Sequence, residues 1–168
     1  MELHVEPRKV ISWKEFLKNY PDYSIALDGF VYGRPRRLEP KIEKGEIIRG
    51  PYANFNHHED VDRIATRSTC AQAYYAIRLG FLDSYKVGKE LKGHTWVNDC
   101  DQDTCFADWL IKNHELIIDK KERHTIKQFI YAEDFFDTTG GAYPFDLKDP
   151  LMEKLAWVYE AYTSARLK

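Results

Sequence analysis

The chain has 168 residues, enough for one compact domain with a core, and its 43% hydrophobic fraction is that of a globular protein and excludes general disorder. Its formal net charge of −2 excludes the strongly basic composition of a dedicated duplex-DNA-binding protein. The odd number of cysteines (three), an N-terminus without a signal-peptide-like apolar core, and the absence of an apolar run of roughly 20 residues together predict a cytoplasmic protein that does not enter a membrane.

The first predicted element is a helix that begins after Ser12. Ser12 and Glu15 have the spacing of a capping box, an apolar stripe follows them, and Pro21 ends the helix. A β-type run at residues 23–27 then leads into Asp28-Gly29, and a loop or hairpin covers roughly residues 31–50.

Two further strands are predicted, each followed by a helix. The run YANF at residues 52–55 leads directly into Asn56-His57-His58-Glu59-Asp60, and Ser68 or Thr69 is expected to cap a helix that ends near Leu79. The run HTWV at residues 94–97 leads into a segment with Asp99, Asp101 and Asp103, and a helix is expected to start at Thr104.

The C-terminal part is predicted to be helical with one long loop. Residues 119–131 are expected to form a helix, residues 134–145 a glycine-containing loop, and residues 149–165 a last helix with Pro150 in its first turn. Because strands and helices alternate, we expect a single α/β domain over residues 1–168, with a mainly parallel sheet flanked by helices. The helix at 149–165 either packs on this domain or leads out of it.

Three of the predicted strands end in residue types that bind metal ions. The first ends at Asp28, the second at His57, His58 and Asp60, and the third at Asp99, Asp101 and Asp103. The carboxyl ends of parallel strands meet at one edge of a sheet, so these side chains could share a site. Carboxylates with imidazoles suit Mn²⁺ or Mg²⁺, and several carboxylates can hold two ions.

Two other interpretations of these residues remain open. An Asp after a strand is often a helix cap, and adjacent histidines in a loop are often incidental. Cys100 and Cys105 could instead join a histidine in a structural zinc site, although their spacing is not that of a zinc-binding pair.

The motifs together resemble the DHH phosphoesterase superfamily. Asn56-His57-His58 resembles its DHH motif, Asp28 its lone strand-end aspartate, Asp99-Cys100-Asp101 its DxD motif, and Asp137-Thr138-Thr139-Gly140-Gly141 its Asp-Thr-Gly motif. The chain departs from the family in three ways: the DxD motif follows the histidines, as in a circular permutation; Asn56 replaces an aspartate; and the usual C-terminal substrate-binding domain is missing.

The resemblance implies a DHH-like core and two metal ions, Mn²⁺ or Mg²⁺. Its metal ligands would be Asp28, His57, Asp99, Asp101 and Asp137; His58 and Asp101 would act in catalysis, and His58 and Arg67 would bind the substrate. The expected reaction is hydrolysis of a phosphate ester or phosphodiester in a small ester, a nucleotide or a short single-stranded nucleic acid.

Two alternatives to this function follow from the same residues. One is a non-catalytic protein that binds metal or nucleotide on the same scaffold. The other is a phosphohydrolase of the HD type, which His57-His58-Glu59-Asp60 also resembles, although that class is mainly helical.

Overall fold

The protein is described here from a computed structural model, which covers residues 1–119, 124–142, 144, 146 and 148–166. Its centre is a five-stranded sheet in the order β1, β9, β2, β6, β3. The strands are β1 (Glu2–Val5), β9 (His94–Val97), β2 (Ser24–Leu27), β6 (Tyr52–Phe55) and β3 (Arg36–Leu38). The first four run parallel, and β3 pairs antiparallel with β6. The predicted α/β architecture with a mainly parallel sheet is therefore confirmed.

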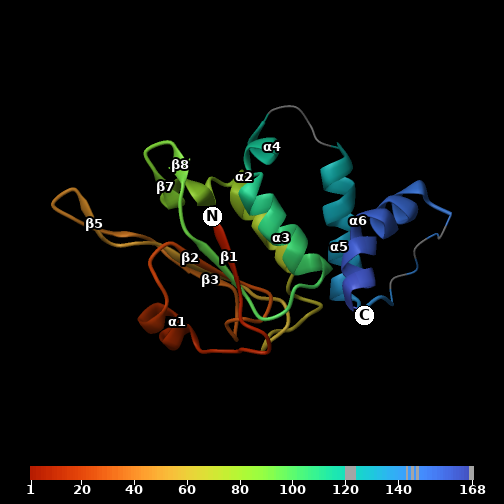
Figure 1. The fold of residues 1–168 in the computed structure, drawn as a ribbon, viewed down its shortest axis with the longest axis horizontal. Helices are drawn as coiled ribbons and strands as arrows, with labels where there is room; N and C mark the ends of the chain where they lie inside the picture. Colours follow the sequence, from red (N-terminus) through yellow and green to blue (C-terminus); the bar gives the residue numbers. More distant parts are fainter. Residues whose placement is uncertain (120–123, 143, 145, 147, 167–168) are drawn as a thin grey trace.

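Helices cover both faces of this sheet (Figure 1). On one face, α1 (Trp13–Asn19) covers an aromatic cluster that includes Phe16 and Phe30. The other face carries α2 (Thr69–Arg78), the 3-10 helix η1 (Phe81–Tyr85), α3 (Gln102–Lys112) and α4 (Glu115–Ile118), which bury the larger core. Adjacent strand residues point to opposite faces, so Ile25 joins the larger core and Ala26 the aromatic cluster.

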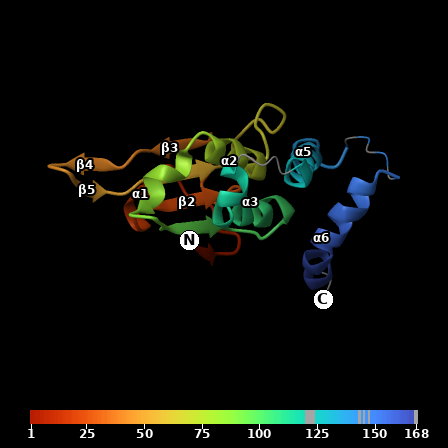
Figure 2. The same cartoon turned by 90° about the horizontal axis from the view of Figure 1, so that it is seen from above.

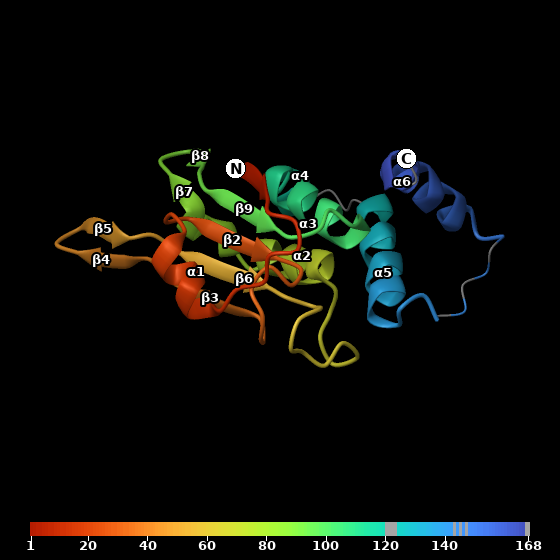
Figure 3. The same ribbon diagram turned by 60° about the horizontal axis from the view of Figure 1, so that its bottom comes forward.

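The helix α5 (His124–Thr138) lies beyond the carboxyl ends of the parallel strands, and α6 (Pro150–Arg166) packs on α5 (Figure 3). Leu155 and Tyr159 of α6 make that contact with Ala132 of α5. The hairpin of β4 (Lys41–Glu43) and β5 (Glu46–Arg49) projects from the opposite end of the molecule (Figure 2), and β7 (Lys86–Val87) pairs with β8 (Glu90–Leu91). No helix in the described part of the chain is long and apolar enough to cross a membrane.

Local sequence signals located most of these elements. The capping box of Ser12 and Glu15 starts α1, β6 and β9 match the predicted strands, and Ser68 caps α2. Strand β1 was not predicted, because an alternating pattern of only four residues is a weak signal and its hydrogen bonds come only from the distant β9.

Two predicted helix boundaries were wrong. The helix α3 begins at Gln102 rather than Thr104, because the Asp101 side chain accepts from Thr104 N and so occupies the N-cap. The helix α5 continues to Thr138, into the segment predicted as a loop, because its last turn is held by contacts to distant residues. Of the helix predicted over 119–131, residues 120–123 lie outside the described part of the chain.

Candidate metal centre

The parallel strands bring their C-terminal residues to one edge of the sheet, as their directions require. Asp28 follows β2, His57 and His58 follow β6, and Asp101 lies in the turn between β9 and α3. One ligand atom each of Asp28, His58 and Asp101 lies within 4.8 Å of the other two. Segments far apart in the chain thus meet at a single group of possible metal ligands.

Asp28 is the buried centre of this group, with a relative exposure of 6%. Its Oδ1 accepts a hydrogen bond of 3.2 Å from the Thr69 hydroxyl, and its Oδ2 one of 3.2 Å from the Thr104 hydroxyl. The Oδ1 atom also lies 3.3 Å from His58 Nε2. The hydroxyls come from the first turns of α2 and α3, so both helices position this carboxylate.

The backbone at Asp28 has an unusual conformation for a residue with a side chain. Its φ of 43° is left-handed, and Gly29 follows with a φ of 84°. A Cβ on Gly29 would lie 3.0 Å from Glu59 Cγ and 3.4 Å from His58 Cβ. The sharp turn therefore serves to bring the Asp28 carboxylate and the histidine loop together, at a backbone cost that is common at functional sites.

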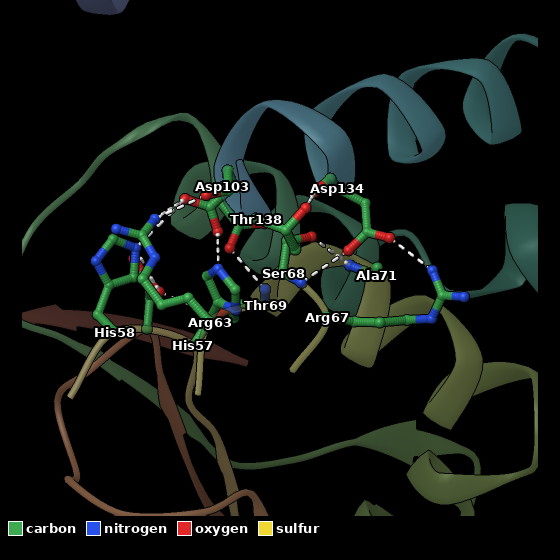
Figure 4. A network of polar contacts seen from close by, with 12 residues as sticks. His57, His58, Arg63, Arg67, Ser68, Thr69, Ala71, Asp103, Asp134 and Thr138 are labelled. Atoms are coloured by element: carbon green, nitrogen blue, oxygen red, sulfur yellow. Dashed lines mark hydrogen bonds and ion pairs between the residues drawn. The ribbon is translucent and has the colours of Figure 1, made fainter. Parts of the chain in front are cut away.

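A second contact group joins the histidine loop to the last turn of α5. Asp137 Oδ2 lies 3.1 Å from His57 Nε2, and Asp137 Oδ1 lies 3.4 Å from His58 Nε2. Arg63 donates to both the backbone oxygen and Oδ1 of Asp137, at 2.8 and 3.0 Å. Figure 4 shows His57, His58 and Arg63 side by side below α5.

Several of these buried polar atoms lack a hydrogen bond. His57 is fully buried, and neither its Nδ1 nor its Nε2 has a hydrogen-bond partner; the same holds for His58 Nε2 and Asp137 Oδ2. Unsatisfied buried polar atoms are costly and rare, so their concentration here calls for a binding partner. Imidazole nitrogens and carboxylate oxygens are the atoms that a metal ion would satisfy.

The carboxylates of the site repel one another in a region that excludes water. Burial, followed by the charges of Asp103, Asp101 and Asp137, raises the pKa of Asp28 well above its ordinary value. Burial, followed by Asp137, raises the pKa of Asp103 to about 7, and burial, followed by Asp103, raises that of Glu133 to about 8. The site therefore favours bound protons or another cation.

The two histidines have opposite pKa shifts. The close contact with the Asp137 carboxylate is the main cause that raises the pKa of His58, whereas burial is the main cause that lowers the pKa of His57. His57 is thus favoured in its neutral form, which is the form that binds metal.

Asn56 organises the loop that carries both histidines. Its Nδ2 donates to the backbone oxygens of Gly33 and Glu59, and its Oδ1 accepts from the backbone N–H groups of His58 and Glu59. The amide therefore uses its donors and its acceptor within the loop and on the neighbouring segment at Gly33, which gives Asn56 a structural role.

Asp103 and Asp134 serve the N-terminus of α2. Asp103 accepts from the N–H groups of Thr69 and Cys70 at 2.6 and 2.7 Å, and Asp134 accepts from Ser68 N at 2.8 Å. Both carboxylates stabilise the positive end of the helix dipole as well as its free N–H groups. The cap interpretation of strand-end aspartates is therefore correct for Asp103, and for Asp101 with respect to α3.

Two cavities adjoin the acidic group. One, of about 390 Å³, is lined by Arg8, Asp28, His58, Asp99 and Asp101, among others. The other, of about 370 Å³, is lined by Asp101, Asp103, Glu133 and Asp137 together with Gln102, Phe136 and Gly140. Asp101 borders both cavities. Asp99, predicted as a metal ligand, is exposed and lines the first cavity, and it does not belong to the group of ligand atoms formed by Asp28, His58 and Asp101.

Arg67, predicted to bind the substrate, lies apart from this group. Its guanidinium pairs with Asp134 at 2.6 Å and lies over the Tyr75 ring, 5.3 Å from the ring centroid. It points away from His57 and His58 (Figure 4) and borders a different cavity between α2 and α5.

The sequence predicted five residues of this site, namely Asp28, His57, His58, Asp101 and Asp137. It did not predict Arg63 or Glu133. Arg63 gave no signal because its partner Asp137 is 74 positions away; Glu133 could have been found as a carboxylate on the apolar face of α5. Cys100 and Cys105 do not belong to any group of three potential metal ligands among the described residues.

Comparison of the chain with protein-family models, with curated proteins and with solved structures gives no match.

Proposed function

We propose that the chain is a metal-dependent phosphoesterase whose metal centre is formed by Asp28, His57, His58, Asp101 and Asp137. The observation that carries this proposal is the convergence of Asp28, His58 and Asp101 within 4.8 Å at the ends of parallel strands. The DHH-like arrangement of the motifs, with their order permuted, agrees with it but rests on resemblance alone.

The donor set fits divalent cations that prefer oxygen. Three carboxylates and two imidazoles combine hard oxygen ligands with nitrogen, which suits Mn²⁺ best and Mg²⁺ next. His57 Nε2 and Asp137 Oδ2, 3.1 Å apart without a hydrogen bond, have the spacing of two ligand atoms on one ion. The other oxygen of Asp137, Oδ1, lies 3.4 Å from His58 Nε2, so the same carboxylate could bind a second ion together with His58.

The metal ions, when bound, would lower the pKa of a coordinated water and neutralise charge on a phosphoryl group. The chain's own residues hold these ligands in place. Thr69 and Thr104 orient the two oxygens of Asp28, Arg63 fixes Asp137, and Asn56 fixes the loop that carries the histidines. The cavity beside Asp28, His58 and Asp101 leaves space for the phosphate of a substrate.

The substrate class that fits is a small ester or the end of a single strand. The cavity of about 390 Å³ has room for a nucleotide-sized group and not for a duplex. Arg8 is the cationic group on its wall that can bind a phosphate by charge.

The test is hydrolysis by the metal-stripped protein after addition of Mn²⁺ or Mg²⁺. The panel contains an aryl phosphate, an aryl phosphodiester, nucleotides, pyrophosphate and short single-stranded oligonucleotides. Activity should require the metal and should fall by about 100-fold or more in Asp28→Asn and His57→Ala. Glu115→Gln, a change at an exposed carboxylate of α4, is the matched control and should keep full activity.

The metal content of the His58→Ala variant shows whether His58 binds the metal or the phosphate. His58 Nε2 lies with Asp28 and Asp101, so His58→Ala should lower both metal content and turnover. Metal retained with turnover lost would instead assign His58 to the phosphate. A metal-loaded protein that is inert on the whole panel would contradict the enzyme and favour the non-catalytic metal- or nucleotide-binding protein.

A further inference from the structure

A second group of metal-ligand side chains lies at the opposite edge of the sheet. Glu2 and His94 are the first residues of β1 and β9 and are direct partners in the parallel ladder, and His4 pairs with Trp96 two positions further on. Side chains two residues apart share one face of a strand, so these four side chains stand together. The strand ends near Asp28 and His58 lie at the other edge.

The ligand atoms of this group have the spacing of a coordinated ion. His4 Nε2 and His94 Nδ1 share a hydrogen bond of 2.9 Å, whose proton a bound ion would replace, and Glu2 Oε2 lies 3.6 Å from each of these nitrogens. A point in the plane of the three atoms lies about 2.0 Å from all of them, which is the length of zinc–nitrogen and zinc–oxygen bonds. An ion could bind here with little movement of the side chains.

The surrounding structure holds the two imidazoles in place. The His4 ring stacks on Trp96, with centroids 4.0 Å apart and an angle of 12° between the planes. Backbone hydrogen bonds of 3.0 Å join Glu2 N to Gly93 O and His94 N to Tyr23 O. Gly93 is required there, because a Cβ would lie 2.2 Å from Tyr23 O. Rigid support of this kind reduces the entropy that binding would cost.

We propose that Glu2, His4 and His94 form a second metal site, selective for a zinc-class ion such as Zn²⁺, Co²⁺ or Cu²⁺. Two imidazoles and one carboxylate favour these ions over Mg²⁺, which prefers oxygen ligands. The side chains of His4 and His94 are 27% and 30% exposed, so an ion can enter from solvent and keep an open coordination position. The bound ion would join the edge strand β1 to β9. This site does not depend on the phosphoesterase proposal.

The experiment measures Zn²⁺ binding by calorimetry to untagged, metal-stripped protein in excess Mg²⁺. The site of Glu2, His4 and His94 should bind one equivalent both in the wild type and in Asp101→Asn, which changes the other centre. Loss of an outer-shell partner alone weakens metal affinity by about 10–100-fold, so His94→Ala and His4→Gln should weaken it by at least about 100-fold. His124→Gln, at an exposed histidine of α5, is the matched control and should bind as the wild type.

Trp96 provides a readout at the site itself. Because the His4 ring stacks on it, Cu²⁺ bound at His4 should quench Trp96 fluorescence, and the quenched component should disappear in Trp96→Phe and in His4→Gln. If His94→Ala fails to fold, Glu2→Gln and His4→Gln decide the result. Zinc affinity that is unchanged in the Glu2, His4 and His94 variants, or lost only in Asp101→Asn, would overturn the proposal.

Discussion

At the scale of single residues, Asp101 combines two functions that point to different experiments. Its Oδ1 accepts from Thr104 N at 2.8 Å and so caps α3, while its carboxylate also belongs to the group with Asp28 and His58. Asparagine is as good an N-cap as aspartate but carries no charge. Asp101→Asn therefore removes the charge and keeps the cap, whereas Asp101→Ala removes both.

We expect Asp101→Asn to bind Mn²⁺ more weakly while the metal-free protein keeps or slightly gains stability, since one repelling charge is removed. Asp101→Ala should lose metal affinity and also about 1 kcal/mol of stability, because the cap is lost. Thermal unfolding with and without Mn²⁺ measures both effects. Equal large losses of stability in the two metal-free variants would mean that the Asp101 charge is structural.

Asn56→Asp tests whether an aspartate directly before the two histidines would improve the site. The amide of Asn56 donates to two backbone oxygens, those of Gly33 and Glu59, and a carboxylate cannot. We expect a loss of roughly 1–3 kcal/mol of unfolding free energy and no gain of activity.

The control for this change is Asn98→Asp, at the corresponding position after β9, where the half-buried Asn98 lines the cavity of the site. Asn98→Asp should lower the free energy of unfolding, measured by chemical denaturation, by less than Asn56→Asp does. Higher hydrolysis in Asn56→Asp would show instead that this position acts as a metal ligand.

At the scale of elements, the N-terminus of α2 is capped by other helices. Ser68 caps Ala71 N within α2, but Asp103 of α3 and Asp134 of α5 accept from Ser68, Thr69 and Cys70. Three helices are joined at this point, directly beside Asp28. Their arrangement therefore determines the geometry of the candidate metal centre.

Asp103→Ala should destabilise the protein by roughly 2–4 kcal/mol, because two buried N–H groups of α2 lose their acceptor. Removing a repelling carboxylate would offset part of this loss. Urea unfolding of the metal-free protein measures the difference, with Asp99→Asn as a control at an exposed carboxylate in the loop before α3. A metal-free Asp103→Ala as stable as the wild type would rule out the capping role.

At the scale of the whole molecule, the buried acids make stability depend on pH. Burial raises the pKa of Glu133 from 4.5 to about 8, so the folded protein retains a proton that the unfolded chain has already lost in this range. Stability contributed by the protonated group is fully present below pH 4.5 and is lost as the pH rises through about 8.

The variant Glu133→Gln isolates this effect, since glutamine has nearly the same shape and does not ionise. Relative to this variant, the metal-free wild type should become less stable between about pH 5 and pH 8. Melting temperatures of both proteins across this range, with a chelator present, give the measurement. A constant difference between the two would mean that Glu133 does not titrate in the folded state.

The sequence by itself determined the elements whose signals are local. The capping box at Ser12 and Glu15, the runs YANF and HTWV, and the cap at Ser68 depend on neighbouring residues, and each located its helix or strand. The parallel sheet followed from the alternation of strands and helices, and it predicted that Asp28 and the histidines share one edge.

Only the tertiary structure decided which side chains meet and in what role. It placed His58 with Asp28 and Asp101, paired Asp137 with Arg63, turned Arg67 toward Asp134, and assigned Asp103 to the cap of α2. It also made Glu2–Val5 a strand, through pairing with residues about 90 positions away. Such contacts depend on the packing of distant segments, and a local pattern carries no information about partners that the chain brings together only when it folds.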